Sequence, residues 1–401
     1  VPSHASLFTG LYPREHGAEN PVPMLRGGLP TLASHLGAHG YATVAVTNNP
    51  LIYGETGLAA GFDEVRLRPG ANGRPRWLGQ AEFLLGLADS GAAATTRLVG
   101  ELLPRLRRPF FLFINYLECH WHYLPPRRFE RRFARQNWPQ SVRYRLRSRR
   151  RLVWEAIADA DASRLALYND LYDAELATLD ERFGRLLDHL RRAGLWEETV
   201  LLLTSDHGEN IGEDGLASHQ GSLRQNLIHV PFLAKIPGRR RERIHGLTQF
   251  TDAFAGLCRL LDVAVPEHLS ERPLAIDPFR LAGDDPGRPF AFAEWRGWSP
   301  EKLQRLARRA SRFDFARIPG ALEAVQDGRV KLVVDDLQRE RLYDLVADPG
   351  EGASTARPEE AARLREALSQ WRAAHPSRLP EDYSPEEHAA VESRLRELGY
   401  L

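Results

Sequence analysis

Short, unbroken apolar runs separated by helical stretches are the feature that most restricts the fold of this chain. Residues 41–47 (YATVAVT), 109–116 (PFFLFINY) and 199–204 (TVLLLT) are rich in β-branched and other large apolar residues, and residues 229–234 (HVPFLA) form a weaker fourth run. Because these runs are apolar at successive positions, both faces of each strand need cover. The pattern predicts a mainly parallel central sheet with helices packed against it.

Amphipathic helical patterns lie between these runs. Residues 31–39 form a short one, and residues 163–192 form a long one with apolar side chains three and four positions apart. Gly194, just beyond the long pattern, suits the left-handed position that follows a helix end. The alternation of strands and helices predicts an α/β fold.

The pattern changes after about residue 285, where short strands at residues 289–294 and 330–335 precede charged helices, the last at residues 386–398. We therefore expect two parts. Residues 1–284 would form a larger α/β domain, and residues 285–401 a C-terminal subdomain with a small antiparallel sheet and terminal helices.

Charge and cysteine content narrow the classes of function. The 401 residues carry a formal net charge of +1, which provides no overall field for binding nucleic acid. Cys119 and Cys258 are too few for a disulfide framework and form no CxxC metal motif. The longest apolar run, residues 109–117, is too short to span a bilayer. An arginine-rich segment at residues 127–151 is either a solvated helical insertion or a lid that collects anions.

The chain begins at Val1 instead of a methionine, so we expect a segment upstream of it and leave targeting open. A cytoplasmic location is the working expectation. The sequence predicts no oligomeric state.

An Asp-His pair directly follows one of the apolar runs. In the segment TSDHGE, Asp206 and His207 stand at the predicted carboxyl end of the strand, where ligands bind in open α/β sheets. A carboxylate and an imidazole can both reach one cation, so we predict that the pair binds a metal ion. The alternative is a surface turn in which the aspartate caps a helix.

Further histidines stand in the segments that follow predicted strands. His120 and His122 stand two positions apart just past residues 109–116, with aromatic neighbours suited to a substrate wall. His219 lies in the loop after the Asp-His pair. Such residues bind metal or transfer protons, or else are loop histidines without a task. The start of the chain, PSHASLFTG, predicts a helix whose N-terminal N–H groups suit a sulfate or phosphate oxyanion.

Taken in order, these segments resemble the sulfatase family of the alkaline phosphatase superfamily. VPSHASLFTGLYPREHG is similar to the family signature, in which a Cys, Ser or Thr nucleophile is followed by any residue, Pro, Ser and Arg or His. GYATVAVTNN, the segment from His120 to Tyr123, and TSDHGE resemble its next strand, its His-x-Pro-Tyr segment and its second metal-binding segment. ERLYDLVADPGE and the final RLRELGYL resemble its C-terminal elements. The resemblance implies an alkaline phosphatase-like α/β sandwich with a smaller C-terminal antiparallel sheet.

The resemblance also implies roles for individual residues. His4 stands where sulfatases keep an arginine that steadies the nucleophile, and His120 where a histidine contacts the transferred group or protonates the leaving oxygen. An ungapped count puts Gln220 at the place of an anion-binding lysine, but we choose His219 because glutamine carries no charge. The implied set is Asp206 and His207 for metal, His4, His120 and His219 for catalysis, and Asn48, Asn49, His122 and Gln220 for substrate.

The implied activity is metal-dependent hydrolysis of sulfate esters, with an anionic ester as substrate and a covalent intermediate. One divalent cation (calcium, magnesium, manganese or zinc) is expected, and the imidazole ligand favours manganese or zinc. The nucleophile and the acidic ligands of the first strand would lie ahead of Val1, so the chain as given is expected to be N-terminally truncated and inactive.

Two alternatives stay open. His4 departs from the pattern that the cysteine-modifying machinery reads, so the enzyme is alternatively a phosphatase, a phosphodiesterase or a phosphoethanolamine-type transferase. The other alternative is a non-catalytic homologue that binds anions.

Overall fold

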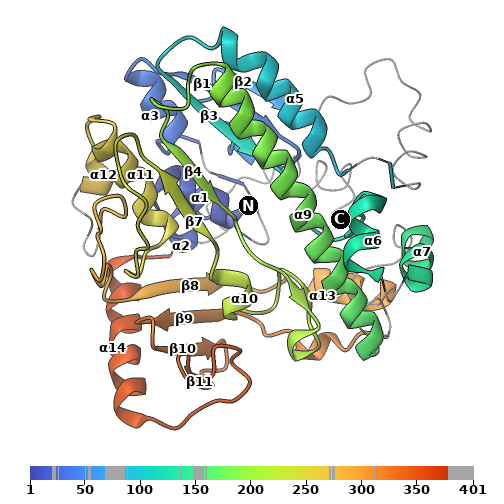
Figure 1. Ribbon diagram of the computed structural model, residues 1–401. Helices are drawn as coiled ribbons and strands as arrows, with labels where there is room; N and C mark the ends of the chain where they lie inside the picture. Colours follow the sequence, from blue (N-terminus) through green and yellow to red (C-terminus); the bar gives the residue numbers. More distant parts are fainter. Residues whose placement is uncertain are drawn as a thin grey trace.

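The computed structural model of the chain has an α/β architecture, and Figure 1 follows its elements from the N-terminus to the C-terminal helix α14. The structure describes residues 1–19, 24–25, 27–49, 51–52, 56–67, 86–87, 89–135, 138–147, 158, 160–270, 272, 276–310 and 312–377. The helix predicted at residues 386–398 and the terminal RLRELGYL segment lie outside these residues.

The secondary-structure elements have the following bounds. The helices are α1 (Pro2–Thr9), α2 (Pro13–His16), α3 (Leu32–Ala38), α5 (Ala92–Leu102), α6 (Arg127–Phe133), α7 (Trp138–Arg147), α9 (Ala162–Arg192), α10 (Gln225–Ile228), α11 (Phe250–Leu260), α12 (Glu267–Ser270), α13 (Pro300–Arg309) and α14 (Pro358–Ala374). The strands are β1 (Ala42–Thr47), β2 (Glu64–Leu67), β3 (Phe110–Asn115), β4 (Leu201–Thr204), β5 (Asn210–Ile211), β6 (Ala217–Ser218), β7 (Phe232–Lys235), β8 (Ala291–Trp295), β9 (Leu322–Gln326), β10 (Val330–Asp335) and β11 (Glu340–Asp344).

The first sheet is parallel, with strand order β2-β1-β3. In its register Val44 of β1 stands opposite Leu112 of β3. Val44 and Val46 pack against α5 and α9 on one face. Phe111 and Phe113 of β3 face the other way, toward the helices α1, α3 and α11. Helices therefore cover both faces, as continuous apolar runs require, and the predicted α/β class is confirmed.

The other two predicted strands form a separate pair within the described residues. β4 and β7 run antiparallel, with Leu202 opposite Ala234. Both runs are strands as predicted, but β7 does not extend the parallel arrangement. The ammonium of Lys235 at the end of β7 bonds to the carbonyl of Thr199 at 3.2 Å, which holds the two strands together. An apolar run specifies burial and not direction, so the sequence pattern left this orientation undetermined.

The predicted smaller antiparallel sheet is also present, with strand order β11-β10-β9-β8. Figure 1 shows α14 running alongside this sheet. Leu364, Leu368 and Trp371 of α14 pack against Val325 and Leu332 of the strands. The sheet begins shortly after residue 284, where the sequence placed a domain boundary, and that boundary stays a prediction.

The arginine-rich segment is helical where the structure describes it, in α6 and α7. The buried guanidinium of Arg145 bonds to the buried carboxylate of Glu130 at 2.7 Å, and Arg128 bonds to Glu181 of α9 at 2.7 Å. These arginines fix α6 and α7 to each other and to α9, which favours the helical-insertion interpretation of residues 127–151. Within the described part of the chain, no helix is long and apolar enough to cross a membrane.

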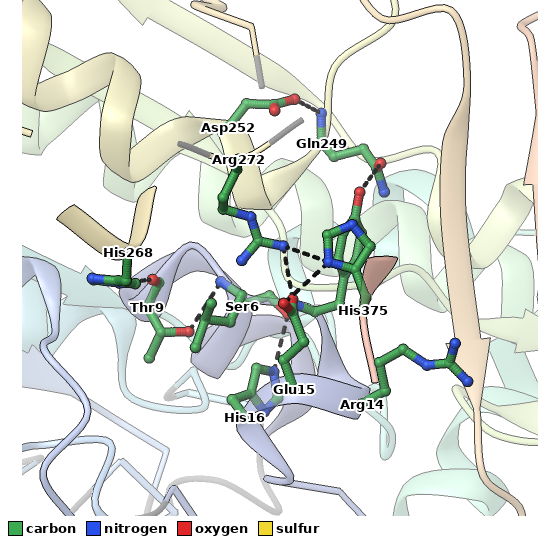
Figure 2. A network of polar contacts seen from close by, with 12 residues as sticks. Ser6, Thr9, Arg14, Glu15, His16, Gln249, Asp252, His268, Arg272 and His375 are labelled. Atoms are coloured by element: carbon green, nitrogen blue, oxygen red, sulfur yellow. Dashed lines mark hydrogen bonds and ion pairs between the residues drawn. The ribbon is translucent and has the colours of Figure 1, made fainter. Parts of the chain in front are cut away.

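A polar joint connects the N-terminal helices to the far end of the chain (Figure 2). Glu15 of α2 accepts hydrogen bonds from Arg272 at 2.7 Å and from His375, just after α14, at 3.1 Å. His16, next to Glu15, bonds through Nε2 to the hydroxyl of Ser6 in α1 at 3.1 Å. The joint therefore fixes α1, which carries His4, in a frame that includes α14.

Candidate active site

Three of the predicted residues meet at the carboxyl end of β4. Asp206 and His207 follow this strand directly, and His4 projects from the buried side of α1. Asp206 Oδ2 lies 3.3 Å from Nδ1 of His4 and 3.4 Å from Nε2 of His207. The predicted metal pair and the histidine that replaces an arginine therefore form one cluster.

The surroundings of His207 favour a neutral imidazole with an available lone pair. Its Nδ1 lies 2.8 Å from the carbonyl oxygen of Gly208, so Nδ1 carries the proton and donates it. Nε2 then faces Asp206 without a proton. Burial, and next the charge of His219, lower the pKa of His207, which keeps the ring neutral. A backbone carbonyl that fixes the tautomer in this way is typical of a metal-binding histidine.

Asp206 is ionised in the same cluster. Burial alone would raise the pKa of Asp206, but interactions with His207 and His4 lower it below its ordinary range. Burial lowers the pKa of His4 to about 4, so that ring is neutral at physiological pH. One half-buried carboxylate beside two neutral imidazoles suits a cation.

A second group of side chains adjoins the first. The ring of His219 stacks on that of His207 with centroids 4.0 Å apart, and the ring of His120 lies 5.2 Å from that of His219. One potential ligand atom from each of His120, His219 and Glu209 lies within 4.8 Å of the other two. The structure therefore brings His120 and His219 together with His207, as the resemblance implied.

The hairpin β5–β6 explains how Glu209 reaches His219. Asn210 pairs with Ser218, so the residues on either side of this pair, Glu209 and His219, stand next to each other. Oε1 of Glu209 lies 3.3 Å from Nδ1 of His219. Ser218 has a φ of 63°, a left-handed conformation that is uncommon for serine and turns His219 back toward the cluster.

Glu209 is a site residue that the sequence reasoning missed. It is buried, and its other oxygen, Oε2, accepts a hydrogen bond from the hydroxyl of Tyr123 at 3.0 Å. Burial raises the pKa of Glu209. Sequence reasoning could have found Glu209 from its position in TSDHGE, where it follows the two predicted metal ligands by two residues. Because Tyr123 and His219 occupy both of its oxygens, Glu209 orients the His219 ring.

The four predicted substrate residues lie in different surroundings. Gln220 lines a large cleft together with Asp206, His207 and His219. His122 packs its ring 5.4 Å from that of Trp121. Asn48 and Asn49 follow β1 and make local bonds. Oδ1 of Asn48 accepts from Thr95 at 2.8 Å, and Oδ1 of Asn49 accepts from the N–H of Leu51 at 2.9 Å.

The cleft itself has a volume of about 2100 Å³, far more than a sulfate group fills. Its walls come from α1, from the segment that joins β7 to α11, from the C-terminal sheet and from α13. Lys302 of α13 lines it, and the sequence reasoning assigned this lysine no role. Lys302 follows Gln220 by more than eighty positions, so no local motif connects it with the site.

The sulfatase family model matches residues 1–263 of the chain. The chain belongs to the sulfatase family, within the alkaline phosphatase superfamily, as its motifs predicted. By family it is a sulfatase-type hydrolase, and members of this family bind a divalent metal ion.

Individual relatives give the same placement. The chain is similar to the multifunctional alkaline phosphatase superfamily protein PehA of Trinickia caryophylli, with 24% identity over 95% of this chain and 86% of that protein. It is 27% identical to an arylsulfatase of Volvox carteri over 44% of this chain, but that match spans only 29% of the arylsulfatase.

A solved structure supports the fold. The phosphonate monoester hydrolase of Agrobacterium radiobacter superimposes with a TM-score of 0.70 at 21% identity, over 93% of this chain and 86% of that one.

Proposed function

We propose that this chain carries the site of a metal-dependent sulfuric ester hydrolase that acts through a covalent intermediate. The observation that supports this proposal is the convergence of His4, Asp206, His207, His120 and His219 beside one cleft, which Asp206, His207 and His219 line. These residues come from α1, from the end of β4 and from two further loops, and they supply metal ligands and proton-transfer groups together. An anionic ester is the substrate class that such a set suits.

Asp206 and His207 are the residues that would hold the metal ion. The ionised carboxylate and the unprotonated Nε2 face each other, which fits a single divalent cation. When bound, the cation neutralises the non-bridging oxygens of the ester. The group of His120, Glu209 and His219 also offers three donor atoms. We assign it to proton transfer instead, because Glu209 is already bonded to Tyr123 and His219.

The histidines take the remaining roles. The Nδ1 of His120 lies 2.7 Å from the carbonyl oxygen of Trp121, so its Nε2 is the ring nitrogen available to the substrate. His120 is positioned to transfer a proton to the leaving oxygen. His219 is oriented by Glu209 and is neutral because burial lowers its pKa to about 3, so it is positioned to accept a proton. His4 contacts Asp206 and helps to hold this carboxylate in position. Asn48, Asn49, His122 and Gln220 remain the proposed substrate contacts.

The choice between sulfate and phosphate is tested with matched aryl esters. The full gene product, including whatever the gene encodes ahead of Val1, is assayed with 4-nitrophenyl sulfate, 4-nitrophenyl phosphate, bis-4-nitrophenyl phosphate and 4-nitrophenyl phenylphosphonate. The last ester is included because one structural relative is a phosphonate monoester hydrolase. We expect the highest kcat/KM for the sulfate. A higher value for a phosphorus ester favours the phosphatase or phosphodiesterase alternative, and turnover of none favours the anion-binding homologue.

Reading the codon immediately before Val1 tests the expectation that the nucleophile lies there. A cysteine favours a modified-cysteine sulfatase, and a serine or threonine favours a directly acting hydroxyl group. The 401-residue chain assayed by itself is expected to turn over little or no ester.

A further inference from the structure

Helix α13 lies next to the candidate site because of the way it packs. Leu303 and Leu306 sit against the hydrophobic cluster that contains Tyr123 and Tyr168. Tyr123 belongs to the loop that begins with His120, and Tyr168 belongs to α9. Figure 1 shows α13 beside the beginning of α9. This packing fixes one side of α13 to the loop that carries the catalytic histidine.

The same helix presents two cations to the cleft. Lys302 and Arg305, one turn apart, both line the cleft that contains Asp206 and His219. Burial, and next the charge of Arg305, lower the pKa of Lys302 to about 8, so the ammonium stays charged at neutral pH. The ammonium lies 5.2 Å from the ring centroid of Trp298, a cation–π contact that holds the side chain against the wall.

Lys302 and His219 line the same cleft. The helix that carries Lys302 also packs against the cluster that contains Tyr123, three residues after His120. Helix α13 therefore adjoins the part of the site where the proposed function puts the leaving oxygen.

Neither cation has an acidic partner among the residues that the structure describes. Two buried cations elsewhere in the chain meet carboxylates: Arg182 meets Asp89 at 2.8 Å and Arg145 meets Glu130 at 2.7 Å. Holding two like charges one turn apart in a partly desolvated wall is unfavourable unless an anion joins them. The unpaired cations thus indicate a ligand group of negative charge.

We propose that Lys302 and Arg305 bind a second anionic group, a carboxylate or a further sulfate, on the alcohol part of the substrate. This inference rests on the proposed function and names the substrate class of the same site. The proposed function places the ester group at the residues around Asp206, whereas α13 packs beside the loop that follows His120, which the proposed function puts toward the leaving alcohol. The preferred substrates are therefore esters whose alcohol carries its own negative charge.

The test uses two aryl sulfates that differ in one charge, 3-carboxyphenyl sulfate and 3-carbamoylphenyl sulfate. Their binding to the 401-residue chain is measured by isothermal titration calorimetry. The variants are Lys302→Met, Lys302→Arg and Arg305→Met, and Arg308→Met on the exposed side of α13 is the matched control. We expect the chain to bind the carboxylate about tenfold more tightly than the amide, as one charge pair at a partly exposed site provides.

The variants separate the outcomes. Lys302→Met should abolish the preference for the carboxylate, Arg305→Met should reduce it, and Lys302→Arg and Arg308→Met should retain it. Three results would overturn the inference. The unchanged chain could bind the two esters with equal affinity, or it could bind neither ester. Lys302→Met could also weaken the binding of both esters equally. Turnover by the full gene product is scored separately. Turnover without a charge preference refutes only the inference, and a charge preference without turnover refutes only the proposed hydrolysis.

Discussion

The joint around Glu15 gives a prediction whose size follows from the structure. Interactions with the side chains of His375 and Arg272 and with the N–H of Tyr12 outweigh the opposing effect of burial and lower the pKa of Glu15 from 4.5 to about 2. At about 1.4 kcal/mol per pKa unit, this shift corresponds to roughly 3 kcal/mol of stability in favour of the ionised, folded form. The substitution Glu15→Gln keeps the shape of the side chain and removes its charge.

The direction of the pH dependence is fixed by the lowered pKa. The contribution of Glu15 is complete above the unfolded-state pKa near 4.5, and it is lost as the pH falls toward 2. We therefore expect Glu15→Gln to reduce the free energy of unfolding by roughly 3 kcal/mol at pH 7 and by about half of that at pH 3. Below pH 2 the variant and the original chain should converge.

Urea unfolding followed by tryptophan fluorescence at pH 7, 5 and 3 measures these differences. Glu359→Gln, on the exposed side of the first turn of α14, is the control and should change the free energy of unfolding little at any of these values. A loss for Glu15→Gln that is the same at pH 7 and pH 3 would show that the charge of Glu15 does not stabilise the joint. A loss below about 1 kcal/mol at pH 7 would refute the argument from the pKa.

Three further predictions concern the site and the core. Asp206→Asn and His207→Ala should each weaken binding of Mn²⁺ or Zn²⁺ at least tenfold, measured by titration calorimetry, because each removes one of two facing ligands; unchanged affinity would move the metal site elsewhere. Lys331→Met should lower the free energy of unfolding by about 3–5 kcal/mol, because it leaves the buried carboxylate of Glu351 without its cation. Adding Glu351→Gln should recover part of that loss, and no recovery would argue against the pairing. Leu190→Ala should lower the free energy of unfolding by about 2–5 kcal/mol through a cavity beneath β1, checked by urea unfolding, and a loss below 1 kcal/mol would contradict the packing.

The sequence predicted the parallel sheet well because each of its main strands is a continuous apolar run. Residues 41–47 and 109–116 contain β1 and β3, and both faces of these strands are covered as the pattern required. The sequence pattern could not predict the direction of β7, because a strand has the same hydrophobic periodicity in either orientation. That pairing depends on tertiary contacts such as the bond from Lys235 to the carbonyl of Thr199, just ahead of β4.

The positions of the candidate site residues were predictable where each residue follows its own strand or helix. Asp206 and His207 come directly after the apolar run that forms β4, and His120 lies a few residues after the run that forms β3, so the sequence could place each of them past the carboxyl end of a strand. Glu209 comes next to His219 because of the register of the β5–β6 hairpin, and the sequence alone does not specify that register. Lys302 reaches the cleft because α13, which is distant in sequence from the other site residues, packs beside it. No local sequence motif marks this long-range contact.

The bond between Glu15 and His375 spans 360 positions of the chain. During synthesis the ribosome makes α1 and α2 well before the end of α14, so this support of α1 is completed late. The helix that carries His4 therefore reaches its final position only after the C-terminal sheet and α14 have been made and docked. A chain stopped by a premature stop codon before residue 375 would carry most of the site residues without this anchor for α1.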